Sequence, residues 1–96
     1  MTYRLTRRAR RDVLEIWRRI AEDNEPAADR FIDLLTYHFR LLGDNPHVGR
    51  RREELRPGYR SFPVREYLIL YRIMAPGVQI LHVLHGRRDI AALFGR

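Results

Sequence analysis

Apolar side chains in the first quarter of the chain recur at the spacing of an α-helix. Together they make one stripe on one helical face, at Ala9, Val13, Ile16, Trp17 and Ile20. Thr6, just before this stripe, is a residue type preferred at helix N-caps. The alternation Tyr3–Leu5 before it is typical of a short edge strand. The pattern predicts a strand that leads directly into an amphipathic helix.

Asn24-Glu25-Pro26 ends the first helical pattern, and Pro26 predicts the first turn of a second helix, because proline is favoured there. Its apolar positions form two adjacent stripes, which is wider than a helix with one buried side requires. The stripes consist of Ala28, Ile32, Leu35, Phe39 and Leu42, and of Phe31, Leu34, His38 and Leu41. Gly43-Asp44-Asn45-Pro46 ends the pattern. We therefore expect a helical hairpin whose second helix packs on two sides.

From Tyr59 onward the period changes to that of strands. Segments 59–64, 67–74 and 78–85 are rich in β-branched and aromatic residues and are predicted to be strands. The tight connection Ala75-Pro76-Gly77 predicts that the last two strands form a hairpin. Because both faces of these strands are apolar, we expect the hairpin in the middle of the sheet. The polar stretch before Gly58, with Arg50-Arg51-Arg52, is predicted to be an exposed loop, and Asp89 to cap a short turn over 90–94.

These elements predict an α+β fold in the order β-α-α-β-β-β. A helical hairpin would pack on a small, largely antiparallel sheet, and a short helical turn would follow at the C-terminus. The 96 residues give room for one domain, over 1–96.

Composition excludes several kinds of chemistry. The chain has no cysteine, which removes thiolate metal sites and thiol nucleophiles. All 19 basic residues are arginine, so mechanisms that need a tunable amine are excluded. The chain starts without an apolar signal core, and no apolar run approaches the roughly 20 residues of a membrane helix. We expect a cytoplasmic protein with no membrane contact, no cofactor and no metal.

Charge points to an acidic partner. The 19 basic residues against 12 acidic ones give a net charge of +7. Such a surface suits nucleic acid, a nucleoprotein machine or an acidic protein. A solvated basic surface without a specific partner is the alternative interpretation.

Several segments together resemble the ParE/RelE superfamily of toxin–antitoxin toxins, and its ParE branch in particular. The most specific segment is Val83-Leu84-His85-Gly86-Arg87-Arg88-Asp89. The others are Tyr3-x-Leu5, Ala9-x-x-Asp12-x-x-x-Ile16, Pro46-x-x-Gly49, Leu55-x-x-Gly58-x-Arg60, Arg60–Val64 and Tyr67–Arg72. The resemblance spans nearly the whole chain, and the order of elements agrees with it.

The resemblance implies a toxin neutralised by a small ParD-like antitoxin, whose flexible acidic and apolar segment wraps the toxin. We expect a hetero-oligomer, with a heterotetramer as the default. Specificity would depend on side chains along the two helices and on the sheet edge. The candidate antitoxin-binding residues are Trp17, Arg19, Arg30, Asp33, Leu34, Tyr37 and Leu41.

Two targets remain open. ParE-like toxins are described as poisoning DNA gyrase, which requires binding but no catalysis; the candidate target-binding residues are Arg60, Arg72, His85, Arg87 and Arg88. RelE-like toxins cut mRNA on the ribosome, and the candidate catalytic residues for that reaction are His85, Arg60, Arg72 and Glu54. Cleavage needs a base, a cation for the phosphate and an acid. Lysine is absent and Phe94 replaces the C-terminal tyrosine that RelE-like nucleases often have, so binding is favoured over catalysis.

Each candidate also has a purely structural interpretation. Arg60 and Arg72 would then be sheet-face charges paired with Glu66 or Asp89, and His85 would end a strand before a capped turn. The aromatic residues Trp17, Tyr67 and Tyr71 are expected to pack in the core, and His38 at its edge. His82 and His85 are three apart, so on a strand they point to opposite faces and do not chelate one metal. A repressor acting alone is disfavoured, because no helix-turn-helix is evident.

Overall fold

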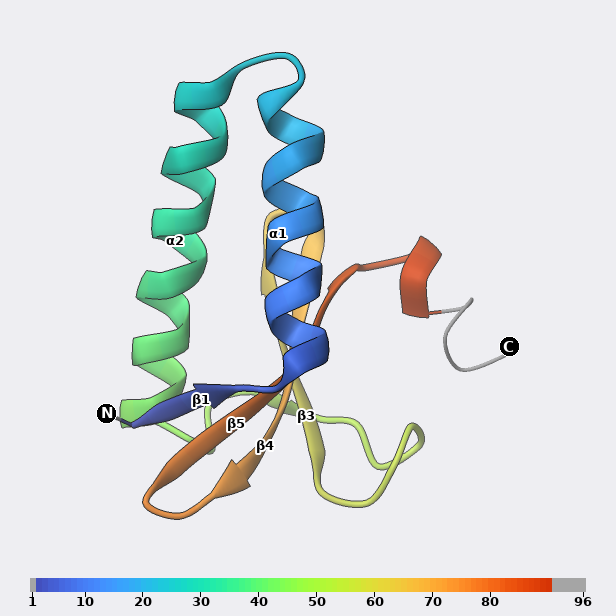
Figure 1. Cartoon of the computed structure of the whole chain (residues 1–96). Coiled ribbons are helices and arrows are strands. Elements are labelled where there is room, and N and C mark those ends of the chain that lie inside the picture. The colour runs from blue at the N-terminus through green and yellow to red at the C-terminus, as the bar shows by residue number, and fades with distance from the viewer. Residues whose placement is uncertain (1, 91–96) are drawn as a thin grey trace.

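The computed structural model describes residues 2–90, whose strands form one five-stranded sheet. A hairpin of two helices packs on one face of this sheet (Figure 1). Along the chain the elements are β1 (Tyr3–Leu5), α1 (Arg7–Ala21), α2 (Glu25–Asp44), β2 (Arg50–Arg51), β3 (Tyr59–Val64), β4 (Tyr67–Met74) and β5 (Gly77–His85). The strand order is β1-β5-β4-β3-β2, and only the β1–β5 pair is parallel. The predicted α+β class, the edge position of β1 and the central β4–β5 hairpin are confirmed.

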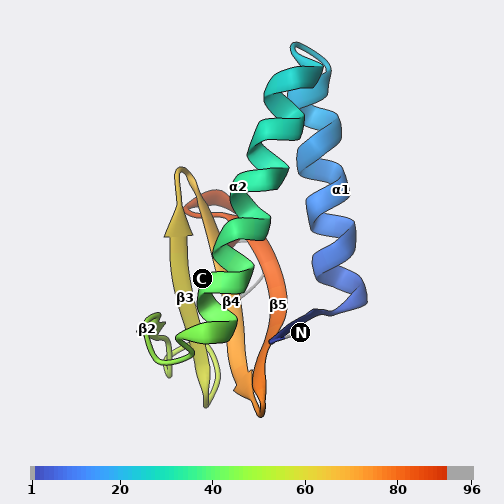
Figure 2. The same ribbon diagram turned by 90° about the vertical axis from the view of Figure 1, so that its left-hand side faces the viewer.

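Both helices begin where the sequence predicts. The Thr6 hydroxyl accepts a hydrogen bond from the Ala9 amide, and the Asn24 side chain accepts one from the Ala27 amide, each at 3.0 Å. Each bond satisfies an amide that a helix start would otherwise leave without a partner. The helices run side by side, and Figure 2 shows α2 lying across the sheet with α1 farther toward its β1 edge. Helix α2 thus contacts both α1 and the sheet, as its double stripe predicts.

The core lies between the helical hairpin and the sheet. It includes Phe31, Leu35 and Phe39 of α2 together with Tyr67, Tyr71 and other residues of β4 and β5. Burying each large apolar side chain contributes about 1.5–3 kcal/mol. The expectation that Trp17 belongs to this core is wrong. Its indole N–H donates to the Asp29 carboxylate at 2.8 Å, so Trp17 links α1 to α2 outside the core cluster.

One residue is inserted into β5 where it pairs with β4. Leu70 pairs with His82 but the next residue, Tyr71, pairs with Ile80, which leaves Leu81 as the extra residue of a β-bulge. The bulge resets the alternation of the strand. Ile80 and Val83, three residues apart, therefore both lie in the core.

Two expectations near the chain's polar segments need correction. The loop before Gly58 is not exposed throughout, because Arg50–Arg51 pair with β3 and Gly49 is buried. Asp89 does not precede the last turn, which already begins at Arg88; its carboxylate instead accepts the His85 amide at 2.8 Å. The predicted continuation through Phe94 lies outside the described residues.

Neither α1 nor α2 is long and apolar enough to span a bilayer.

Candidate binding surfaces

Arg60 and Arg72, two of the predicted target-binding residues, point to opposite faces of the sheet. Arg60 pairs across the strands with Tyr71, a core residue on the helix-covered face. Arg72 pairs with Tyr59 on one side and Gln79 on the other, one position further along β4. Since side chains alternate along a strand, Arg72 lies on the face away from the helices.

Arg60 holds a loop in place. Its guanidinium donates to the His47 and Gly49 carbonyls at 3.2 and 2.9 Å. The neighbouring Tyr71 hydroxyl accepts the Gly49 amide and donates to the Pro46 carbonyl, both at 2.8 Å. Burial raises the pKa of Tyr71, although the Gly49 amide bond and the charge of Arg60 oppose that rise. The two side chains thus fix the turn between α2 and β2.

On the opposite face, Arg52 organises a small polar cluster. Its side chain is only 16% exposed, and it donates to the Glu54 carboxylate at 2.8 Å and to the Ser61 hydroxyl at 3.1 Å. The hydrogen bond from Arg52 lowers the pKa of Glu54. Ser61 shares its face with Arg72, whose guanidinium donates to Gln79 at 2.8 Å.

The remaining predicted target residues lie at the end of β5 and beyond it. His85 pairs with Tyr67, and their ring centroids are 5.7 Å apart, edge to face. Tyr67 is a core residue, so His85 lies on the helix-covered side of the sheet. Arg87 and Arg88 follow on the exposed turn, where Arg88 is 3.7 Å from the Asp89 carboxylate.

The four residues considered for RNA cleavage are therefore divided between the two faces. Arg60 and His85 lie on the helix-covered face of the sheet. Arg72 lies on the opposite face, and Glu54 lies in the loop between β2 and β3, bonded to Arg52 on that opposite side. General acid–base cleavage requires these groups within hydrogen-bond reach of one phosphate. Arg72 shares a sheet face with Ser61, the partner of Arg52 in the Arg52–Glu54 pair, whereas His85 lies on the other face.

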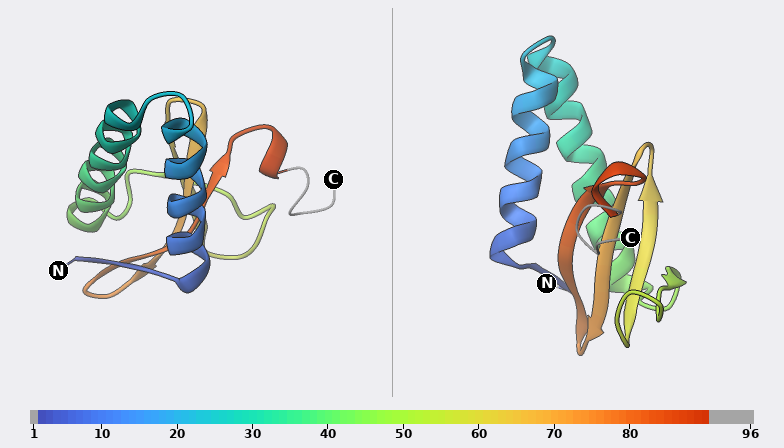
Figure 3. Two further views of the ribbon diagram at one scale, coloured as in Figure 1. Left: turned by 45° about the horizontal axis from the view of Figure 1, so that its top comes forward. Right: turned by 90° about the vertical axis from the view of Figure 1, so that its right-hand side faces the viewer.

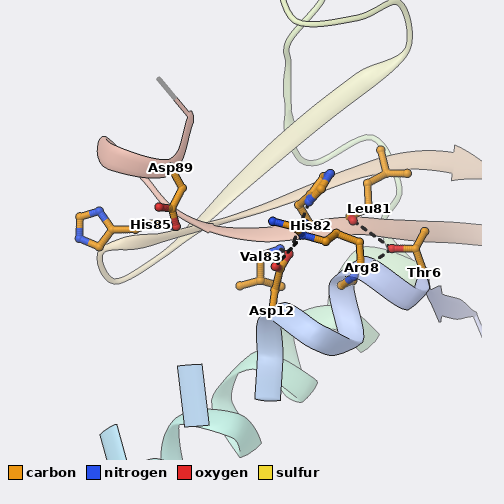
Figure 4. Close-up of polar contacts among 9 residues, drawn as sticks. Thr6, Arg8, Asp12, Leu81, His82, Val83, His85 and Asp89 are labelled. Carbon is orange, nitrogen blue, oxygen red and sulfur yellow. Dashed lines mark hydrogen bonds and ion pairs between the residues drawn. The ribbon is translucent and has the colours of Figure 1, made fainter. Parts of the chain in front are cut away.

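A carboxylate that sequence reasoning assigned no role holds the free edge of β5 (Figure 4). Asp12 on α1 accepts the Val83 amide at 3.1 Å and the Arg8 guanidinium at 3.2 Å, with the His82 ring nitrogen Nδ1 3.5 Å away. Just before it, the Thr6 hydroxyl donates to the Leu81 carbonyl at 3.0 Å. A sequence signal existed, because Asp12 stands three after Ala9 and four before Ile16, within the apolar stripe.

A groove separates the tip of the helical hairpin from the turn between β3 and β4. We call it the hairpin groove; it measures about 400 Å³ and is lined by Arg19, Ile20, Asp23, Asn24, Ala27, Phe31, Arg65, Glu66 and Tyr67. A smaller adjoining hollow adds Arg30. The floor is apolar and aromatic, whereas the rim carries three guanidinium groups against two carboxylates. No carboxylate of the described residues lies within ion-pair distance of these three arginines.

The predicted antitoxin-binding residues fall into three groups. Arg19 and Arg30 line the hairpin groove and its hollow. Asp33 and Tyr37 are exposed on α2, with Tyr37 59% exposed. Leu34 and Leu41 are half-buried against the core, and Trp17 is bound to Asp29. Sequence reasoning missed Arg65, whose place in the groove depends on how the sheet turn meets the hairpin.

Within residues 2–90, no three histidine, aspartate or glutamate side chains come together as a metal site would require.

The chain is similar to toxins of toxin–antitoxin systems. The family described as "ParE toxin of type II toxin-antitoxin system, parDE" matches residues 3–90. Toxin ParE3 of Caulobacter vibrioides is 35% identical over 92 residues, which are 95% of this chain and 92% of that protein. Toxin RelE3 of the same organism is 34% identical over 79 residues, which are 81% of this chain and 86% of that protein.

The fold is also similar to that of a solved structure. A chain of the chromosomal ParDE TA system from P. aeruginosa superimposes with a TM-score of 0.75 at 22% identity. The match covers 88% of this chain and 95% of that one.

Proposed function

Because the chain belongs to the ParE toxin family of type II toxin–antitoxin systems, we propose that a ParD-like antitoxin holds it inactive and that the free toxin inhibits DNA gyrase. Inhibition would follow from binding the gyrase–DNA complex after cleavage and preventing religation. The toxin and its antitoxin would both be cytoplasmic. The inactive form would be a hetero-oligomer, by default of two toxins and two antitoxins.

The hairpin groove is the observation that supports the antitoxin partner. An apolar floor formed by Ile20, Phe31 and Tyr67 suits apolar side chains of a disordered segment that folds on binding. The rim arginines Arg19, Arg30 and Arg65 have no carboxylate partner in residues 2–90, so they are available to acidic residues of that segment. Charge-assisted bonds to guanidinium groups are stronger than neutral ones.

The placement of the basic residues supports binding, rather than cleavage, at the target. Arg72 is exposed on the sheet face away from the helices, and Arg87 lies on the exposed turn after β5. Arg60, in contrast, is occupied by loop carbonyls. A basic face of this kind can bind a nucleoprotein complex through its phosphates without a catalytic group.

Ribosome-dependent mRNA cleavage is the second candidate function. The similarity to Toxin RelE3 favours it, and so does the Arg52–Glu54–Ser61 cluster, which shares a sheet face with Arg72. In that reaction Arg72 would bind the scissile phosphate, and Glu54 would take the proton of the 2′-hydroxyl. The 2′-oxygen would bond to phosphorus as the bond to the 5′-oxygen breaks, and the leaving 5′-oxygen would take a proton from water.

Induction of the chain in a bacterial host tests the proposal and separates the two targets. Growth should stop when the chain is expressed alone and resume when its antitoxin is co-expressed. Gyrase poisoning predicts induction of a DNA-damage reporter with intact mRNA, because double-strand breaks persist. Cut mRNA without DNA damage would move the function to the second candidate, and unimpaired growth of cells that contain folded chain would contradict both.

A substitution sharpens this experiment. Arg72→Ala should reduce toxicity under the gyrase proposal, whereas Glu54→Gln, which keeps the shape but removes the carboxylate, should leave it unchanged. Loss of toxicity in Glu54→Gln, with normal folding, would instead support mRNA cleavage.

A further inference from the structure

Helix α1 concentrates arginine at the end where a helix favours carboxylates. Four of its first five residues are arginine, and its first turn has no acidic residue. The N-terminus is the positive end of the helix dipole, so cations there are unfavourable. Arg7 and Arg11 are also four residues apart, a spacing at which like charges repel. Of these four arginines, only Arg8 lies within ion-pair distance of a carboxylate in residues 2–90, that of Asp12. The other three therefore weaken the start of the helix.

Three arginines of α1 form a straight row on its outer side. Arg7, Arg11 and Arg18 stand at i, i+4 and i+11, which places them within about 40° of one another around the helix axis. All three are exposed, and the buried positions of α1, such as Ala9 and Ile16, face the opposite way. Figure 3 shows α1 at the margin of the molecule, with α2 and the sheet on its inner side. We call this surface the α1 arginine row.

The surroundings of the α1 arginine row select the kind of partner. Leu14, between Arg11 and Arg18, is the one exposed large apolar side chain of α1. A protein interface or a lipid surface needs a broader apolar area than this single side chain. None of the three arginines of the row lies within ion-pair distance of a carboxylate in the described part of the chain. A straight row of guanidinium groups without an apolar floor matches a regular array of anions.

The phosphate backbone of duplex DNA is such an array. Each strand carries one phosphate per about 3.4 Å of the duplex axis. From Arg7 to Arg18 the helix rises by about 16 Å, so a strand lying along α1 presents about five phosphates to the row. Guanidinium groups bind phosphate oxygens through paired, charge-assisted hydrogen bonds. Phosphates beside the first turn also meet the positive end of the helix dipole, and their charge offsets the repulsion among the arginines.

We infer that the α1 arginine row binds the phosphate backbone of duplex DNA, and that this DNA is the duplex cleaved by gyrase. The second part rests on the proposed function. Helix α1 packs on the sheet face from which Arg72 points away, so the DNA contact of the row is separate from any contact made through Arg72. The row reads no sequence, because phosphate contacts carry no base information.

The salt dependence of binding to a labelled duplex of about 20 base pairs tests the α1 arginine row. The triple variant Arg7→Gln, Arg11→Gln, Arg18→Gln removes three charges and lowers the net charge from +7 to +4. Between about 50 and 200 mM salt, the logarithm of the affinity should fall less steeply for this variant, by about one unit of slope per lost arginine. At the lower salt concentration the variant should bind the duplex about tenfold more weakly than the wild type.

A matched triple variant separates the row from the general field of the protein. Arg50→Gln, Arg51→Gln, Arg56→Gln lowers the net charge equally, in β2 and the loop that follows it. This variant should keep the wild-type salt slope and lose no more than about twofold in affinity. Urea unfolding provides a second control. Arg7→Gln with Arg11→Gln should not lower stability, because repulsion at the start of α1 is relieved.

Three results would overturn the α1 arginine row as a DNA-binding surface. The first is an equal salt slope in the wild type and in both triple variants. The second is a loss of stability in Arg7→Gln with Arg11→Gln, which would give these arginines a structural role. The third is tighter binding of a labelled poly-glutamate peptide than of the duplex, since the occupant would then be an acidic protein.

A gyrase assay tests the assignment of the duplex and keeps it distinct from the proposed function. With gyrase and plasmid, the Arg7→Gln, Arg11→Gln, Arg18→Gln variant should produce less linear DNA than the wild type. Wild-type amounts of linear DNA from this variant, despite its weaker duplex binding, would overturn the assignment to the gyrase duplex. Unaffected gyrase in the presence of the wild-type chain, with duplex binding as expected, would contradict the proposed function and leave the row intact.

Discussion

The carboxylate of Asp12 on α1 accepts the backbone amide of Val83 on β5 across 71 positions of sequence. Asp12 is only 7% exposed, and the bond lies just beyond the point where β1 stops pairing with β5. One side chain therefore closes the edge of a central strand and ties α1 to the sheet. Two residues further on, the Asp89 carboxylate does the same for the His85 amide.

Asp12→Ala should destabilise the fold by about 1–3 kcal/mol, because the Val83 amide would remain buried without an acceptor. Asp12→Asn keeps an acceptor oxygen and should cost less. Urea unfolding followed by circular dichroism measures both. Glu15→Ala, an exposed carboxylate on the same helix, is the control and should change stability by no more than about 0.5 kcal/mol. Equal stability of Asp12→Ala and Glu15→Ala would show that the Asp12–Val83 bond contributes nothing.

Stability should fall at alkaline pH through Tyr71. Its pKa is raised in the folded state by burial, so the folded protein holds this proton more tightly than the unfolded chain does. The contribution is fully present below the ordinary tyrosine pKa of about 10 and is lost as the pH rises through the folded pKa.

Tyr71→Phe isolates this effect. The variant should be less stable at neutral pH by about 1–3 kcal/mol, since the buried Gly49 amide loses its acceptor, and its stability should decline less steeply above about pH 10. Tyr37→Phe, at an exposed position, is the matched control and should keep the wild-type slope. An unchanged slope in Tyr71→Phe would assign the alkaline loss to other groups.

Arg65 should show opposite effects on stability and on binding. Its φ of 57° lies in the left-handed region, which costs a residue other than glycine about 1 kcal/mol. Arg65→Gly should therefore raise the free energy of unfolding by roughly 0.5–1 kcal/mol, while weakening antitoxin binding because a rim cation of the hairpin groove is lost. Arg65→Lys keeps the charge and should bind more tightly than Arg65→Gly in a calorimetric titration. Full-strength binding by Arg65→Gly would remove Arg65 from the interface.

Gly77→Ala should disturb the docking of β1. A Cβ atom at Gly77 would overlap the carbonyl of Thr2, which accepts the Val78 amide at the start of the β1–β5 ladder. Because the overlapping group is backbone and not a flexible side chain, it cannot move aside easily. We therefore expect the free energy of unfolding to fall by about 1–3 kcal/mol. Hydrogen exchange should show faster exchange of the Val78 amide in this variant. Wild-type stability and protection would mean that β1 can shift without cost.

Local patterns explain why the fold could be predicted. The Thr6 cap, the Pro26 start and the double stripe of α2 are all encoded within a few residues, and each is confirmed. The resemblance to the ParE/RelE superfamily, made on motifs spread over the chain, is confirmed by the family match. Trp17 was misplaced because its position in the stripe is compatible both with the core and with the seam between the helices, where Asp29 binds it.

The arrangement of the polar side chains depended on contacts between distant segments. Arg60 and Arg72 are both candidate target-binding residues by sequence, but strand register assigns them to opposite faces. The role of Asp12 required knowing that β1 ends at Leu5 and exposes Val83. No periodicity in the sequence reports such register and edge relationships. Which of the placed residues contact antitoxin or gyrase stays a prediction.

The central claim is tested most directly with purified gyrase, plasmid DNA and the purified chain. We predict loss of supercoiling activity together with accumulation of linear, cleaved plasmid, reversed when the antitoxin is added in equimolar amount. Arg72→Ala should produce less linear DNA at the same concentration, whereas Glu54→Gln should match the wild type. Normal supercoiling with no linear DNA, from a chain that still stops growth in cells, would contradict the gyrase proposal.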